Sequence, residues 1–176
     1  MSQFLRFALG AGILYGLLMW LMLVLVVRHP VAVAGREAVL AGVIFGPLFA
    51  WMMISFSHSA WVKRSATPTF EPGERVVREG PANHFRRLEA VGGWLYLTNQ
   101  RLVFKSHRLN IQRHQLSLPL DRIATARPSM TAWVIPNGLQ VLTKDGRGER
   151  FVVEGRGEWV AALTAAQQSL PASVGC

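Results

Sequence analysis

The chain has 176 residues, a net charge of +9, 51% hydrophobic residues and a mean hydropathy of +0.25. Its first 56 residues carry only three basic groups and one acid, whereas the remainder carries sixteen basic groups and nine acids. This asymmetry excludes a uniform soluble globule, a polytopic transporter and a disordered chain. The only cysteine is Cys176, the last residue, which excludes an intramolecular disulfide and a prenylation signal.

Two uncharged runs in the N-terminal region, residues 1–56, predict a transmembrane helical hairpin. Residues 7–27 and 38–56 contain no Asp, Glu, Lys or Arg, and about 20 helical residues cross a hydrocarbon core of roughly 30 Å. We expect a loop at 28–37, where Pro30 and Gly35 interrupt the helix. The alternative is a cleaved signal peptide, because residues 32–34 resemble a cleavage site. The first run is, however, longer than the apolar core of about 7–15 residues that is typical of such signals.

The distribution of Lys and Arg around the two runs predicts the orientation. The tail and the first residues after the second run carry Arg6, Lys63, Arg64 and Arg75, whereas the loop carries two arginines. The excess favours cytoplasmic N- and C-termini for a multi-pass protein of the cell (plasma or inner) membrane.

Small residues recur at four-residue spacing in both runs and form candidate packing faces. They are Ala8, Gly12 and Gly16 in the first run and Ala38, Gly42, Gly46 and Ala50 in the second. We favour packing of the two faces on each other, and the alternative is that one faces a second copy or another membrane protein. No ionisable residue lies inside either run, which indicates an anchor rather than an ion path.

After a polar linker at 57–70, residues 71–168 show short β segments separated by turn residues. Segments at 94–98 and 101–106 flank a turn at Asn99-Gln100, and segments at 139–143 and 149–153 flank Asp145-Gly146. Further strands are expected at 74–79, 85–91 (ended by Gly92-Gly93), 116–120 and, in shorter form, 123–126. A helix at 158–168 follows, and 169–176 is a tail. The predicted fold class is an α+β membrane protein: a transmembrane hairpin, then a small antiparallel β-barrel or sandwich of about seven strands, closed by a C-terminal helix.

Residues 92–106 (GGWLYLTNQRLVFKS) resemble the core hairpin of GRAM domains, which have the pleckstrin-homology-like (PH-like) fold. The pieces around it follow in the family's order: 72–74, 117–123, 138–141, 151–153 and Trp159 on the closing helix. The resemblance covers about residues 71–168, although segments 109–115 and 128–136 match no pattern of the family. It implies a domain that binds phosphoinositides, other lipids or proteins.

The sequence offers no pattern typical of catalysis or of a bound metal or cofactor. Among five histidines only His107 and His114 are close together, and no cysteine or acid lies near them. There are no paired carboxylates, nucleophile elbow or phosphate-binding loop. We therefore expect a non-enzymatic protein without a cofactor.

Two groups of basic residues are candidates for binding acidic lipid headgroups. They are Lys105, His107, Arg108, Arg113 and His114 after the core hairpin, and Arg78, Arg86 and Arg87 around the loop between the first two strands. The alternative, equally supported, is that they form solvated faces of a basic domain. Nucleic acid is not favoured, because the charge is scattered and the nearby aromatic residues follow a core pattern.

These observations predict a membrane-tethered GRAM or PH-like domain that binds acidic lipid or a protein partner at the membrane surface. The alternative function is an accessory or scaffold subunit of a larger membrane complex. It would dock on an unidentified membrane protein through the small-residue faces of its helices.

Overall fold

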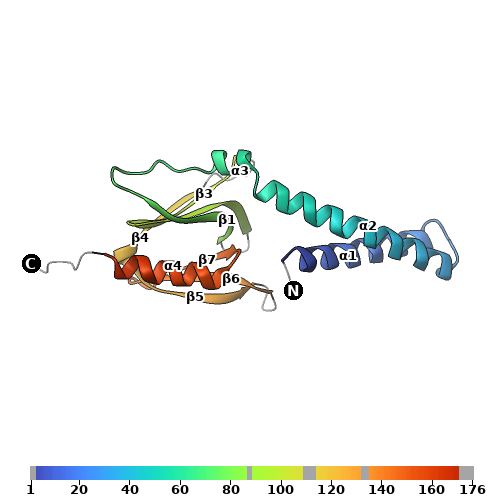
Figure 1. Ribbon diagram of the computed structural model, residues 1–176. Helices are drawn as coiled ribbons and strands as arrows, with labels where there is room; N and C mark the ends of the chain where they lie inside the picture. The colour runs from blue at the N-terminus through green and yellow to red at the C-terminus, as the bar shows by residue number, and fades with distance from the viewer. Residues whose placement is uncertain (1–2, 87–88, 109–113, 132–134, 171–176) are drawn as a thin grey trace, which may run out of the picture. The chain divides into compact units, whose positions relative to one another are not determined.

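The computed structural model describes residues 3–86, 89–108, 114–131 and 135–170, except the side chains of Gln3 and Arg86. The chain divides into two compact units, residues 1–57 and 58–176, and each is described by itself. Figure 1 shows the first unit as two helices and the second as a curled sheet with helix α4 against it.

The first unit is a pair of long apolar helices, α1 (Gln3–Leu25) and α2 (Val31–Ser57). Both are long and apolar enough to cross a membrane by length and composition. The expected loop at 28–37 is too long, because α2 starts directly after Pro30. The Pro30 carbonyl accepts from the amides of Val33 and Ala34, and Gly35 lies inside the helix. Proline is tolerated at a helix start, since the amide it lacks has no intrahelical partner there.

The second unit contains, within its described residues, seven strands in one antiparallel sheet of order β4-β3-β2-β1-β7-β6-β5. The strands are β1 (Val76–Arg86), β2 (Glu89–Thr98), β3 (Arg101–Ser106), β4 (Gln115–Pro119), β5 (Ile123–Thr131), β6 (Ile135–Thr143) and β7 (Gly148–Val153). A single 3-10 turn, η1 (Leu120–Arg122), separates β4 from β5, and α4 (Arg156–Gln168) ends the domain. The predicted antiparallel β architecture with a C-terminal helix is confirmed.

Strand boundaries differ from the sequence prediction at one glycine pair. Gly92 and Gly93 do not end a strand but lie inside β2, which pairs with β1 from Glu89 to Thr98. A Cβ at Gly93 would lie 2.8 Å from the Phe104 ring of β3. The glycine therefore marks a close approach between strands rather than a turn.

The region 128–136, which matched no pattern, is mostly strand. Residues up to Thr131 extend β5, and β6 begins at Ile135. Pro128 is compatible with this assignment because β5 is an edge strand of the sheet.

The predicted linker at 57–70 contains a helix that packs on the sheet. Helix α3 (Ala60–Ser65) begins after Ser59, whose hydroxyl accepts from the Val62 amide. Val62 and Ala66 are buried and pack in a cluster with Trp94, Tyr96 and Val103. Because apolar side chains face the sheet here, residues 60–66 belong to the domain and are not a free tether.

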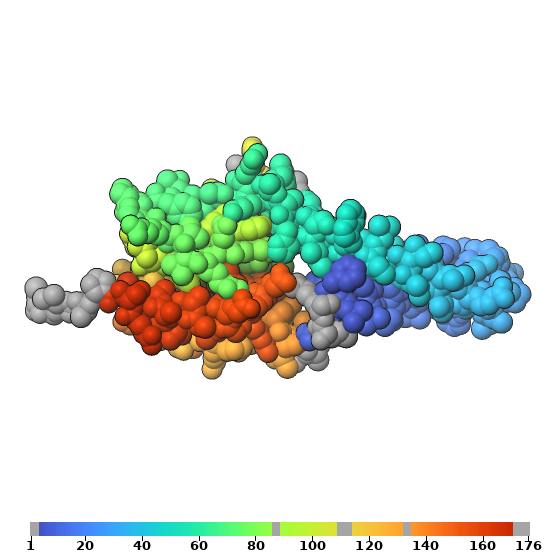
Figure 2. All heavy atoms as spheres, viewed as in Figure 1, coloured from blue at the N-terminus to red at the C-terminus, as the bar shows by residue number. Residues whose placement is uncertain are grey.

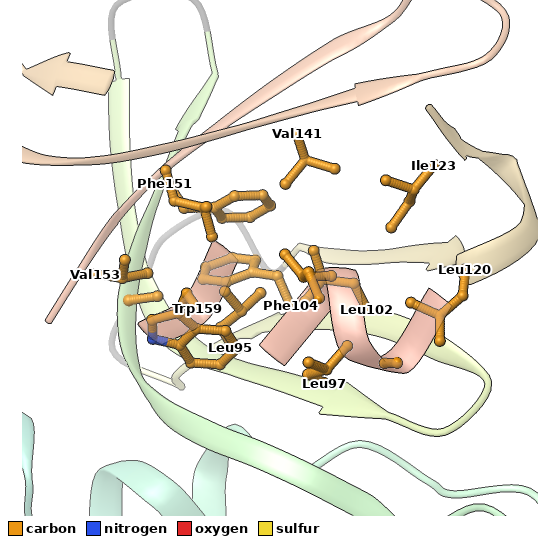
Figure 3. Close-up of a cluster of buried hydrophobic side chains, with 14 of the residues drawn as sticks. Leu95, Leu97, Leu102, Phe104, Leu120, Ile123, Val141, Phe151, Val153 and Trp159 are labelled. Carbon is orange, nitrogen blue, oxygen red and sulfur yellow. The ribbon is translucent and has the colours of Figure 1, made fainter. Parts of the chain in front are cut away.

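The main core lies between the two halves of the curled sheet and α4 (Figure 3). Trp159 of α4 is 2% exposed and lies among side chains from β2, β3 and β7, including Leu95, Phe104 and Phe151. The other face of α4 is part of the outer surface of the domain (Figure 2). Every member of both core clusters lies between residues 62 and 170, so this unit has a hydrophobic core of its own.

Candidate lipid-contacting surface

The small-residue faces of the helical hairpin lie against each other. A Cβ at Gly12 would be 2.6 Å from the Gly42 carbonyl oxygen, and one at Gly16 would be 3.0 Å from that of Ala38. Gly46 lies against Ala8, and Ala50 is fully buried. Such contacts bring the two backbones together as small residues permit. The two faces therefore pack on each other within the hairpin, and docking of an unidentified membrane protein on it stays a prediction.

The basic residues predicted to bind headgroups separate into groups with different surroundings. Arg87 and Arg113 lie outside the described residues, and for Arg86 only the backbone, at the end of β1, is described. Arg78 contacts α4: its guanidinium is 2.7 Å from the Glu158 carboxylate and 5.1 Å from the centre of the Trp159 ring. These two contacts with α4 explain the position of the Arg78 side chain without a headgroup.

His107 and His114 differ from the cations around them. Burial lowers the pKa of His107, because desolvation disfavours the charged form of its ring. The His114 ring stacks at 5.2 Å on His84, whose Nε2 lies 2.8 Å from the Glu149 carboxylate. His84 also stacks on Phe151 and is 2% exposed, so His114 covers part of the core.

Lys105 and Arg108 lie beside the segment that follows α3. The Lys105 ammonium donates to the Thr67 carbonyl at 2.7 Å, and the Arg108 amide is 3.5 Å from the Ser65 hydroxyl. Thr67 is also 3.3 Å from the Tyr96 hydroxyl, whose pKa is raised by burial. These contacts bring residues far apart in the sequence next to the end of α3.

Helix α3 adds two cations that the sequence indicated only for orientation. Lys63 forms an ion pair with Glu79 that raises its pKa, and its ammonium lies 6.0 Å from the centre of the Trp94 ring. Arg64 is exposed and precedes Ser65. Across the described part of the chain, no acidic side chain pairs with Arg64, Lys105 or Arg108. We call these three residues the α3 cation cluster.

No group of three or more His, Cys, Asp or Glu side chains that could hold a metal occurs among the described residues.

Comparison with known proteins identifies the family of the second unit. A family model described as GRAM domain matches residues 63–152, which confirms the resemblance and extends it to α3. No curated protein matches the chain.

Solved structures similar to the chain include PH domains. The C-terminal domain of an unknown protein from Leishmania infantum is 18% identical with a TM-score of 0.49, covering 56% of this chain and 88% of its own. The Vps36 N-terminal PH domain is 17% identical with a TM-score of 0.47, covering 60% and 90%. The Slm1-PH domain, solved in complex with phosphoserine, is 14% identical with a TM-score of 0.43, covering 53% and 97%.

Proposed function

Because the matching family model spans half of the chain, the chain belongs to the GRAM domain family, and we propose that it is an integral membrane protein whose GRAM domain binds anionic lipid headgroups. These headgroups belong to the same membrane that the two helices cross. The observation that carries this proposal is the α3 cation cluster, three cations without acidic partners next to a helix that follows α2 in the chain.

The surface of the hairpin supports the membrane-anchored part of the proposal. Large apolar side chains point outward on both helices; Ile13 and Leu25 are 70% exposed and Ile44 is 68% exposed. Apolar surface in water costs about 25 cal/mol per Å². Hydrocarbon removes that cost, and the helices satisfy their own backbone hydrogen bonds there.

The chain length between α2 and α3 limits how far Arg64 can lie from the end of α2. Helix α2 ends at Ser57 and α3 begins at Ala60. At no more than about 3.5 Å per residue, Arg64 lies within about 25 Å of the end of α2. Headgroup binding is therefore not needed for recruitment; it would orient the domain or make it sensitive to the lipid composition.

The expected strength follows from the charges. Each Lys or Arg close to an anionic leaflet contributes about 1 kcal/mol, so three contribute about 3 kcal/mol, or roughly a hundredfold in affinity. This attraction is screened over a Debye length of about 8–10 Å at physiological salt. Lys63 adds less, because Glu79 already pairs with it.

Vesicle binding by residues 58–176 tests this proposal, since that unit has its own core and retains α3. We expect co-sedimentation with vesicles of phosphatidylcholine and phosphatidylserine, weakening as salt rises, and little with phosphatidylcholine alone. The double variant Arg64→Glu with Arg108→Glu loses at least about 2 kcal/mol of this attraction, so it should weaken binding by about thirtyfold or more.

The matched control is Arg127→Glu with Arg150→Glu, which makes the same charge change at exposed positions of β5 and β7. We expect this pair to retain most of the binding. Equal losses in both double variants, or binding that does not depend on salt, would contradict the assignment to the α3 cation cluster.

A further inference from the structure

The two edges of the sheet differ in how their backbone groups are covered. On edge strand β5, the Ser129 carbonyl accepts from the Arg156 guanidinium at 2.7 Å and the Ile123 carbonyl accepts from the Gln167 amide at 2.8 Å. Both donors belong to α4. On the opposite edge, β4 pairs with β3, and no other strand of the described sheet pairs with it.

The register identifies which groups of β4 are open. The Ser106 amide donates to the His114 carbonyl at 2.8 Å, and the Leu120 amide donates to the Gln100 carbonyl at 2.9 Å. Hydrogen-bonded positions alternate in an antiparallel pair, so the even-numbered residues between them also face β3. The amides and carbonyls of Gln115 and Ser117 therefore point away from β3. Within the described residues these groups have no hydrogen-bond partner.

A cleft of about 360 Å³ runs along this open edge. One wall is formed by four consecutive residues of β4, from Leu116 to Pro119, and the other by Arg122 and the turn between β6 and β7. Side chains of successive strand residues point to opposite faces, so a cleft that touches four in a row meets the strand at its edge. The cleft thus exposes backbone groups and not only side chains.

The charges that line the cleft favour an acidic ligand. Its two acids already have partners: Asp145 pairs with Arg147 at 2.6 Å, and Glu149 lies 2.8 Å from His84 Nε2. Arg122 and Lys144 lie next to each other, because the Lys144 amide donates to the Arg122 carbonyl at 2.8 Å. Both side chains are exposed, and neither forms an ion pair with a described acidic residue.

We propose that the β4 edge binds an extended acidic peptide segment of a partner protein, which adds a strand to the sheet while Arg122 and Lys144 contact its carboxylates. Main-chain hydrogen bonds supply affinity in this mode, and pockets for alternate side chains supply specificity. An isolated headgroup would use the cations but not the row of strand groups, so the open edge favours a peptide. The surface is distinct from the α3 cation cluster, and the proposal does not depend on lipid binding.

Isothermal titration of residues 58–176 with a blocked peptide of alternating Glu and Thr tests the backbone part. Ser117→Pro removes an outward amide without removing a bond to β3, and Ser117→Ala is the matched control that keeps the amide. We expect Ser117→Pro to weaken binding about tenfold and Ser117→Ala to change it less than about twofold. The same peptide N-methylated at alternate residues should bind the unaltered domain about tenfold more weakly, which tests the edge without a change in the protein.

The electrostatic part has its own variants. Arg122→Gln with Lys144→Gln should weaken the acidic peptide about tenfold, whereas Arg127→Gln with Arg150→Gln should not, and a Lys and Thr peptide should not bind. The proposal is overturned if the acidic peptide does not bind. It is also overturned if Ser117→Pro and N-methylation have no effect while the Arg122 and Lys144 variant loses binding, because the cleft is then a simple anion site such as a headgroup would occupy. Arg64→Glu with Arg108→Glu separates the two proposals, since it should reduce vesicle binding and leave peptide affinity unchanged.

Discussion

The Glu74 carboxylate fixes the segment before β1 to the turn between β2 and β3, and its removal is a quantitative test of the domain's stability. The Arg101 guanidinium donates to both carboxylate oxygens, at 2.8 and 2.9 Å. The Thr98 hydroxyl and the Glu71 amide add bonds of 2.9 and 2.8 Å. The Glu74 side chain is fully covered, so little solvent screens these contacts.

The expected magnitude follows from the carboxylate's acidity. The hydrogen bond from Arg101 is the main cause that lowers the pKa of Glu74 from 4.5 to about 2. Each tenfold change in an acidity constant corresponds to about 1.4 kcal/mol, so this fall corresponds to about 3 kcal/mol of folding free energy. Because the folded pKa is lower than the unfolded one, the contribution is present above about pH 5 and is lost as the pH falls towards 2.

Glu74→Gln should therefore lower the free energy of unfolding by about 2–3 kcal/mol at pH 7. Urea unfolding of residues 58–176, followed by tryptophan fluorescence between pH 3 and 7, should show the difference from the unaltered domain narrowing as the pH falls. Glu89→Gln is the matched control, because Glu89 is exposed on β2 and has no ion pair within the described chain. A loss that stays constant with pH, or one no larger than that of Glu89→Gln, would refute the reasoning.

Two further predictions concern packing. Trp159→Ala should destabilise residues 58–176 by about 3–5 kcal/mol, because Trp159 is 2% exposed in the core. Trp159→Phe should destabilise the domain clearly less. Equal urea midpoints for Trp159→Ala and the unaltered domain would contradict the assignment of Trp159 to the core. Gly12→Leu should separate α1 from α2, since a Cβ there would meet the Gly42 carbonyl oxygen at 2.6 Å, whereas a Cβ at Gly10 has nothing within 4 Å. In detergent, the full chain with Gly12→Leu should then unfold at a lower dodecyl sulfate concentration than the unaltered chain, whereas Gly10→Leu should not lower it. Equal losses in the two variants would contradict the assignment of Gly12 to the contact between α1 and α2.

The elements with a local pattern could be predicted from the sequence. Charge-free length marked both long helices, and the Asn99-Gln100 turn follows from short alternating segments around a turn residue. The prediction was less accurate where one residue type is compatible with two different local structures. Gly92 and Gly93 read as a strand end but allow close packing inside β2, and Pro30 and Gly35 read as a loop although α2 begins directly after the proline.

Residues 60–66 were assigned to a linker for a related reason. The segment is short and polar at several positions. Its apolar residues Val62 and Ala66 are buried because they pack against Trp94 and Tyr96, which are distant in the sequence. Once α3 is placed on the sheet, the cations after α2 become part of a surface with Lys105 and Arg108.

By itself the sequence determined the division into an apolar hairpin and a basic β domain, because hydropathy and periodicity are properties of neighbouring residues. Only the tertiary structure decided which cations are available to a ligand. Lys63 is neutralised by an acid 16 residues away, Arg101 by one 27 residues away and Arg78 by one 80 residues away. Net charge counts all of them equally, whereas binding depends on those that folding leaves without an acidic partner, and in the described chain Arg64, Arg108, Arg122 and Lys144 are among these.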